Sequence, residues 1–359
     1  TTGILGWFRI NLFSNWFNSL LTILLLYFLY QIIPPFLNWA IFSADFTHNY
    51  LGELVIDRTF CTRVLEPELG GACWSIIFVR FYQFVYGFYP SEEVWRVNIV
   101  YFLLVVAILP LLFEKFPKRK YFLYFTYIFP VIAYILLAGR FGLTNVSTKN
   151  WGGLLVTLVL GFTGIALAFP IGIILALGRR SKLPVISMMC TLFIEFIRGV
   201  PLITLLFFGM VMLPLFLPEG ITLDGLVRVL VAVTLFQAAY MAEVIRGGLQ
   251  ALPRGQYDAG KSLGMGYWRL HLLVILPQAL KLVIPGIANT FLALVKDTPL
   301  ILVVGLLELV GMIDMAKTNP DWLGFATEGY VFAGIIFWII CFSMSRYSQS
   351  LERKYKTDR

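Results

Sequence analysis

Eight long apolar segments dominate the chain of 359 residues and constrain its fold more than any other feature. A helix needs about 20 consecutive, largely apolar residues to cross the hydrocarbon core of a bilayer. The segments cover residues 18–41, 94–113, 121–139, 151–178, 183–217, 225–249, 279–306 and 322–344. Because backbone polar groups inside a bilayer must bond within their own segment, each is expected to be helical. The sequence therefore predicts an all-α polytopic membrane protein with about eight transmembrane helices.

The fifth segment, residues 183–217, is too long for one straight crossing. Since proline interrupts a helix, we expect an interfacial helix that turns into the bilayer near Gly199, Val200 and Pro201. The first segment lacks the small-x-small cleavage site of a signal peptide, which predicts an uncleaved span.

Hydrophobic residues make up 59% of the chain and charged residues 13%, which excludes an ordinary soluble domain. A net charge of +8 is also typical of nucleic-acid binding, but here the basic residues gather in short loops after every second segment. They are Lys115, Lys118, Arg119, Lys120, Arg179, Arg180, Lys182, Arg254, Lys261, Arg269, Arg346, Arg353, Lys354, Lys356 and Arg359. The positive-inside rule predicts that these loops and both termini are cytoplasmic, with the lipid bilayer and no nucleic acid as partner.

Four cysteines and two histidines show no metal-ligand spacing and no nucleophile–base pair. We therefore predict no metal site and no catalytic residue. Cys61 and Cys73 share one polar loop that the charge pattern places outside the membrane, where an oxidising compartment permits a disulfide. The residues leave open whether the two cysteines are bonded.

A polar stretch, residues 255–277, separates the sixth apolar segment from the seventh. The spacing of the phosphate-binding P-loop is matched by Gly255, Gly260, Lys261 and Ser262. A P-loop follows a buried strand, whereas residues 225–249 predict a helix, and the charge of Asp258 opposes phosphate. We therefore expect a chance match, with no nucleotide or other cofactor bound by this chain.

The same stretch resembles the EAA loop of ATP-binding-cassette (ABC) importer permeases, Glu-Ala-Ala-x3-Gly-x9-Ile-x-Leu-Pro. The corresponding residues here are Asp258, Ala259, Gly260, Gly264, Val274, Leu276 and Pro277. Asp258, Gly260 and Val274 are conservative departures from that pattern. The resemblance implies a cytoplasmic coupling loop, residues 250–278, that docks into a separate ATPase subunit. In that arrangement the partner ATPase uses ATP and Mg²⁺, and this chain is not an enzyme.

Two segments repeat one charge pattern, with Glu195 and Arg198 in the first and Glu243 and Arg246 in the second. Residues three apart lie on one helix face, so each pair can form an ion pair. The two spans run in opposite directions, which places both pairs at the cytoplasmic edge. They are predicted to form a gate or a brace for the loop, or to anchor helix ends. The surrounding stretches, 195–202 and 242–248, resemble signatures of polar amino-acid ABC permeases.

Lys296, Asp297 and Thr298 lie some fifteen residues into the seventh segment. Ionisable side chains at that depth, roughly 20 Å along a helix, are costly unless they face a cavity or each other. They are candidates for the substrate path, and a polar helix end is the alternative. Residues 296–300 resemble the family's Lys-x-Thr-Ser-Leu segment, with Pro299 in place of Ser.

The chain is predicted to divide near Asn150. Residues 1–150 form an N-terminal extension with three spans and a long extracytoplasmic segment, 42–93, whose aromatic residues predict an interfacial helix. Residues 151–359 hold five spans and resemble the core of amino-acid ABC permeases. The extended form resembles the longer subgroup found in general L-amino-acid importers.

The resemblance implies the permease subunit of an ATP-driven amino-acid importer in a bacterial inner membrane. The implied partners are an ABC ATPase subunit, a second and related permease chain, a periplasmic amino-acid-binding protein and an amino-acid substrate. An ion-coupled secondary transporter or channel is the main alternative, and a P-loop membrane enzyme is a third. The residues leave open which amino acids are moved and which permease chain holds the pocket.

Overall fold

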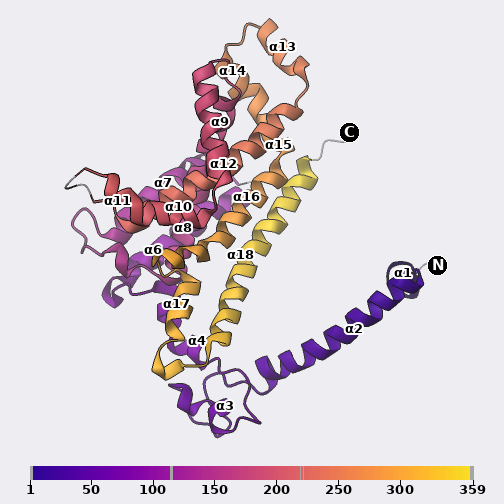
Figure 1. Ribbon diagram of the computed structural model, residues 1–359, viewed down its shortest axis with the longest axis vertical. Coiled ribbons are helices and arrows are strands. Elements are labelled where there is room, and N and C mark those ends of the chain that lie inside the picture. The colour runs from indigo at the N-terminus through magenta and orange to yellow at the C-terminus, as the bar shows by residue number, and fades with distance from the viewer. Residues whose placement is uncertain (1–2, 114–115, 219, 221, 356–359) are drawn as a thin grey trace. The chain divides into compact units, whose positions relative to one another are not determined.

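The computed structural model describes residues 3–113, 116–218, 220 and 222–355 (Figure 1). Helices account for most of this part of the chain, which contains isolated β-bridges but no strand. The predicted all-α class is therefore confirmed. Three basic residues used in the orientation argument, Lys115, Lys356 and Arg359, lie outside the described residues.

Seven helical segments within the described ranges are long and apolar enough to span a membrane, and a bent pair brings the number to eight. The straight ones contain α2 (Trp16–Leu37), α6 (Val94–Leu112), α7 (Arg119–Ala138), α8 (Gly153–Arg179), α12 (Gly225–Ala251), α16 (Ile284–Asp297) and α18 (Ala326–Tyr355). The prediction of about eight spans is thus confirmed. The last helix runs from Ala326 to Tyr355 rather than over the predicted 322–344, since Gly324 turns the chain before it and residues 345–355 contain no Gly or Pro.

The bent pair consists of α9 (Pro184–Gly199) and α10 (Leu202–Phe207), which continues through η5 (Phe208–Met212) into α11 (Leu213–Phe216). The chain bends by 105° between the two arms. Val200 and Pro201 adopt extended backbone conformations between them, with ψ of 135° and 142°. The predicted turn at Gly199–Pro201 is therefore confirmed.

The predicted seventh span, 279–306, is not one helix. It divides into α15 (Leu276–Leu282), α16 and η7 (Thr298–Val304), with Val283 as the break between the first two. Pro285 lies at the start of α16, where its ring would clash with the carbonyl of the preceding turn in a continuous helix. Proline thus places the start of the span near Ile284 rather than at residue 279.

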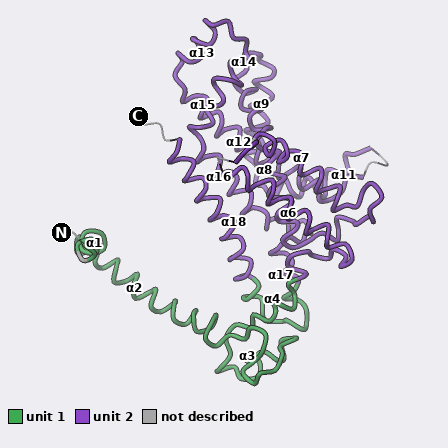
Figure 2. Tube along the Cα trace, turned by 180° about the vertical axis from the view of Figure 1, so that it is seen from behind, with its two compact units in different colours: residues 1–81, 316–329 green, residues 82–315, 330–359 purple. Residues whose placement is uncertain are grey.

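The structure separates into two compact units (Figure 2): residues 1–81 with 316–329, and residues 82–315 with 330–359. In the larger unit, α8 and α12 pack closely because Gly172 lies directly against Met241 and the Ala238 carbonyl. The predicted boundary near Asn150 marks where a permease core begins. It does not refer to these two compact units, and it stays a prediction.

In the smaller unit, α2 has no buried residue, and the loop after it is held by a disulfide between Cys61 and Cys73. The buried carboxylate of Glu328 accepts the Cys73 N–H at 3.1 Å and pairs with Arg63 at 3.2 Å. These contacts hold the disulfide loop against the first turn of α18. Two short helices, α4 (Ser75–Val79) and α5 (Phe81–Tyr86), lie in the stretch predicted to form an aromatic interfacial helix.

Candidate functional site

The polar stretch between α12 and α15 folds into two short helices at one end of the larger unit (Figure 1). They are α13 (Arg254–Ser262) and α14 (Tyr267–Leu270), and η6 (His271–Ile275) joins α14 to α15. Residues 255–262, which match the P-loop spacing, lie inside α13, and the element before them is the helix α12. A phosphate-cradling loop is therefore not formed.

Gly264 makes the turn between α13 and α14 with a φ of 72°, in the left-handed region that favours glycine. The Gly264 N–H bonds to the Lys261 carbonyl at 2.8 Å, and the Met265 N–H bonds to the Gly260 carbonyl at 3.1 Å. This pair of bonds is the Schellman arrangement that closes a helix C-terminus. Gly264 thus ends α13 and makes the turn into α14.

Gly260 provides the contact that holds the two helices together. A Cβ built on it would lie 2.2 Å from Cδ1 of Leu270, which is 3% exposed. Leu270 therefore packs directly on the α13 backbone, in space that a side chain at position 260 would occupy. Within the EAA-like pattern, Gly260 and Leu276 are buried and pack inside the protein. Asp258, Ala259 and Pro277 are exposed at its surface.

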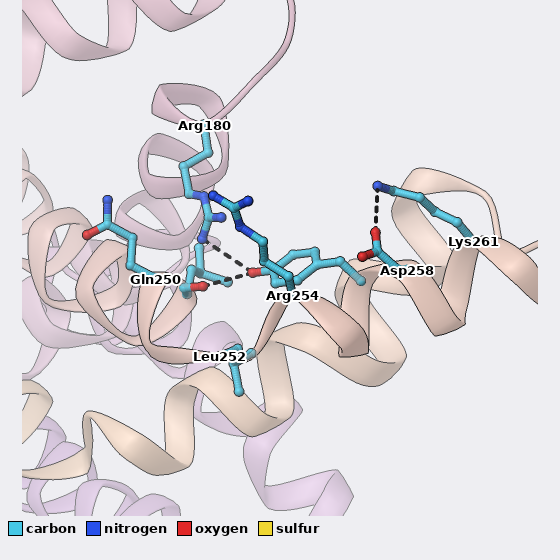
Figure 3. A pocket seen from close by; sticks show the side chains of 8 residues that line it. Arg180, Gln250, Leu252, Arg254, Asp258 and Lys261 are labelled. Atoms are coloured by element: carbon cyan, nitrogen blue, oxygen red, sulfur yellow. Dashed lines mark hydrogen bonds and ion pairs between the residues drawn. The ribbon is translucent and has the colours of Figure 1, made fainter.

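A shallow pocket of about 390 Å³ lies where α13 meets the ends of α8 and α12 (Figure 3). Arg180, Arg254 and Lys261 line it, so its character is basic. The Lys261 ammonium lies 3.6 Å from the Asp258 carboxylate, and both side chains are more than half exposed. This surface presents cations beside one partly neutralised acid.

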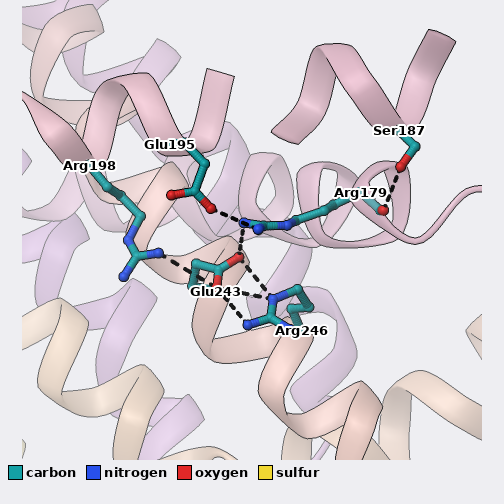
Figure 4. Close-up of polar contacts among 6 residues, drawn as sticks. All are labelled: Arg179, Ser187, Glu195, Arg198, Glu243 and Arg246. Atoms are coloured by element: carbon teal, nitrogen blue, oxygen red, sulfur yellow. Dashed lines mark hydrogen bonds and ion pairs between the residues drawn. The ribbon is translucent and has the colours of Figure 1, made fainter. Parts of the chain in front are cut away.

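Five charged side chains from α8, α9 and α12 form what we call the charge cluster (Figure 4): Arg179, Glu195, Arg198, Glu243 and Arg246. Arg179 bridges the two carboxylates, at 2.7 Å from Glu195 and 2.6 Å from Glu243. Glu243 also pairs with Arg246 at 2.8 Å and with Arg198 at 3.6 Å. The cluster thus links the ends of three helices.

The predicted pairing within each Glu-x-x-Arg segment forms only in the second segment. Among the described residues no ion pair joins Glu195 to Arg198, because Glu195 is met by Arg179 from α8 and Arg198 turns to Glu243. The central role of Arg179 was missed from the sequence, where it served only to orient the loops. Its place at the end of α8, on the side predicted to hold both glutamates, was the available signal.

The candidate substrate-path residues do not form one cluster. Asp297 accepts a hydrogen bond from the Gln237 amide at 3.4 Å, whereas Thr298, the first residue of η7, is buried and donates a hydrogen bond to the Val295 carbonyl of α16. Lys296 is exposed on the single chain. Nothing in this arrangement tests a substrate path, which stays a prediction.

Glu308 is a fully buried acid that sequence reasoning missed. It precedes α17 (Leu309–Ala316), accepts the Gly311 N–H at 2.8 Å and lies 3.4 Å from the Thr157 hydroxyl. Burial raises the pKa of this carboxyl, although the hydrogen bonds from backbone and Thr157 oppose the shift. Its position among leucines, at 306, 307 and 309, was the only sequence signal.

Comparison with known proteins places these features in context. Residues 168–357 match the family model "binding-protein-dependent transport system inner membrane component". The inner membrane amino-acid ABC transporter permease protein YhdY of Escherichia coli is 52% identical over 355 residues, which cover 98% of this chain and 93% of that protein. The glutamate/glutamine/aspartate/asparagine transport system permease protein BztC of Rhodobacter capsulatus is 38% identical, with 99% and 94% covered. A solved structure described as an amino acid ABC transporter with histidines is 29% identical, with a TM-score of 0.49 over 56% of this chain and 92% of that chain.

Proposed function

Because the chain belongs to the family of binding-protein-dependent transport system inner membrane components, and is an amino-acid ABC transporter permease, we propose that α13 and α14 couple its pore to a separate ATPase subunit. In this proposal the permease hydrolyses no ATP and binds no cofactor. ATP and Mg²⁺ act in the partner, whose closure displaces α13 and changes which side of the pore is open.

The construction of the loop carries this proposal. Gly264 closes the α13–α14 turn, and Leu270 packs on Gly260, so the two helices form one unit. That unit leaves Asp258 and Ala259 exposed at the tip, next to the basic pocket. A short helix with a fixed base and an exposed polar face fits a groove on a partner, and the cations of the pocket complement carboxylates there.

The charge cluster is proposed to brace the cytoplasmic ends of α8, α9 and α12 and to rearrange when the pore switches. Ion pairs shared among three helices can exist in a small number of alternative pairings, which suits a two-state element. Lys296 and Asp297 are proposed to face the substrate path, since charged side chains within a span are otherwise costly.

The proposed assembly contains a second, related permease chain, a periplasmic amino-acid-binding protein that delivers the substrate, and the ATPase. The chain lies in a bacterial inner membrane with both termini cytoplasmic. The loops that carry Arg179, Arg254 and Arg346 then share the inner side, as the positive-inside rule requires.

The test is charge reversal at Asp258 in the assembled transporter, purified with its ATPase and reconstituted in proteoliposomes. Asp258→Arg adds a fourth cation at the pocket and should abolish ATP-driven amino-acid uptake while membrane insertion persists. Glu352→Arg, at an exposed acid of α18, makes the same charge change outside residues 250–278 and serves as the control. Uptake by Asp258→Arg equal to that of the control refutes the coupling role, and uptake driven by an ion gradient without the ATPase supports a secondary transporter instead.

A further inference from the structure

We propose that Tyr257, Arg180 and Arg179 form a relay that passes a displacement of α13 to the charge cluster. The proposal rests on the coupling function above and names side chains that transmit the movement. The EAA-like pattern includes none of these three residues.

The Tyr257 hydroxyl is the first element of the relay. It donates a hydrogen bond to the Leu249 carbonyl of α12 at 2.9 Å and accepts one from the Arg180 guanidinium at 3.3 Å. The Arg180 guanidinium carbon also lies 5.5 Å from the centre of the Tyr257 ring, within the range of a cation–π contact. One side chain of α13 is therefore bonded to the ends of both α8 and α12.

Arg180 is adjacent to Arg179, which supplies the second element. Arg179 contacts Glu195 of α9 and Glu243 of α12 from the last turn of α8 (Figure 4). Its own carbonyl accepts a hydrogen bond from the Ser187 hydroxyl of α9 at 2.9 Å. Two neighbouring residues of one helix end thus contact the docking helix on one side and the charge cluster on the other.

This geometry gives the movement a short physical route. When α13 moves, the Tyr257 hydroxyl either carries Arg180 and Leu249 with it or loses both hydrogen bonds. Because Arg179 and Arg180 share one helix end, a shift of Arg180 alters the distances from Arg179 to its two carboxylates. The ion pairs of the charge cluster are therefore an arrangement whose equilibrium can be shifted both by the ATPase, through α13, and by the pore helices.

Tyr257→Phe tests the relay because it removes one oxygen and keeps the ring. The variant is purified with the ATPase and the other subunits and reconstituted in proteoliposomes, where amino-acid uptake and ATP hydrolysis are measured together. The variant loses both hydrogen bonds of the hydroxyl, and each corresponds to roughly a two- to tenfold change in an equilibrium. We expect uptake per ATP hydrolysed to fall by about three- to tenfold, with the complex still assembled.

Tyr121→Phe is the matched control, since this tyrosine of α7 is 69% exposed and its hydroxyl has no hydrogen bond within the described ranges. An uptake-to-ATP ratio for Tyr257→Phe equal to that of the control overturns the relay. A variant that changes uptake and ATP hydrolysis in proportion also overturns it, because the hydroxyl then only stabilises one conformation. If Tyr257→Phe no longer binds the ATPase, the residue acts in docking and the relay is again wrong.

A double variant separates a relay from two independent contacts. If Tyr257 acts through Arg180, combining Tyr257→Phe with Arg180→Gln lowers the ratio no further than the stronger single variant. Multiplied effects contradict the relay. Failure of the proposed function is recognised separately, because the unmodified chain then neither binds an ATPase nor takes up amino acid when ATP is supplied.

Discussion

Removal of the Glu243 charge should destabilise the charge cluster more than any other single substitution in it. Glu243 meets three guanidiniums, at 2.6, 2.8 and 3.6 Å, and its side chain is 15% exposed. Glu243→Gln leaves Arg198 and Arg246 without their ion pair and Arg179 with Glu195 alone, and removing one partner of a largely buried ion pair costs about 3 kcal/mol or more. Glu195 has a single ion pair and is 56% exposed, so Glu195→Gln should cost about 1 kcal/mol or less.

Thermal unfolding of the purified chain in one detergent measures the difference. Each kcal/mol shifts the midpoint of a chain of this size by roughly 2 °C. We therefore expect a decrease of about 6 °C for Glu243→Gln and at most about 2 °C for Glu195→Gln. Equal shifts for the two variants, or a higher midpoint for Glu243→Gln, would show that the shared pairing around Glu243 does not stabilise these helix ends.

Three further predictions concern single features of the fold. Gly264→Ala forces a left-handed backbone on alanine and should cost about 1–2 kcal/mol in unfolding measurements, whereas Gly266→Ala, at a φ of −66° with open space around it, should not destabilise. Replacing Cys61 and Cys73 by serine opens a loop with a sequence separation of 12 and should lower the stability of the smaller unit by about 3 kcal/mol, seen as faster limited proteolysis of that loop. Because burial raises the pKa of Glu308, its protonated form stabilises the fold, and this contribution is lost as pH rises through the raised pKa. Glu308→Gln should therefore show a smaller fall in unfolding midpoint between acidic and neutral pH than the unmodified chain.

The spans were predictable because each contains a long apolar run, although α18 continues beyond its apolar run to Tyr355. The turn at Pro201 was predictable for the same reason, since proline is visible in the sequence. The start of the seventh span was placed too early, although Pro285 was visible as a site for a kink, because apolar residues on both sides of Val283 conceal the break from a hydropathy pattern. Hydropathy reports where a helix can lie in lipid, while the breaks depend on single residues.

The site was predictable where a local pattern defines it and unpredictable where packing does. Gly264 is marked by its spacing from Asp258, and its turn follows from local backbone preference. The pairing of Arg179 with Glu243 joins residues 64 apart in the chain and depends on how α8 packs against α12. No spacing rule connects such residues, so the sequence indicated that they lie on the same side of the membrane but not that they pair.

Gly260, where the chain departs from the EAA pattern, makes helix α13 less stable but makes the whole loop more stable. Glycine inside a helix costs about 1 kcal/mol relative to alanine, so α13 taken alone is weakened. The missing side chain admits Leu270, and full burial of a leucine contributes about 1.5–3 kcal/mol. The burial exceeds the helix cost, and it also joins α14 to the backbone of α13. Glycine at this position therefore makes the two helices a stiffer unit, which is the property a docking segment needs if α13 is to move as a whole rather than bend at the turn before α14.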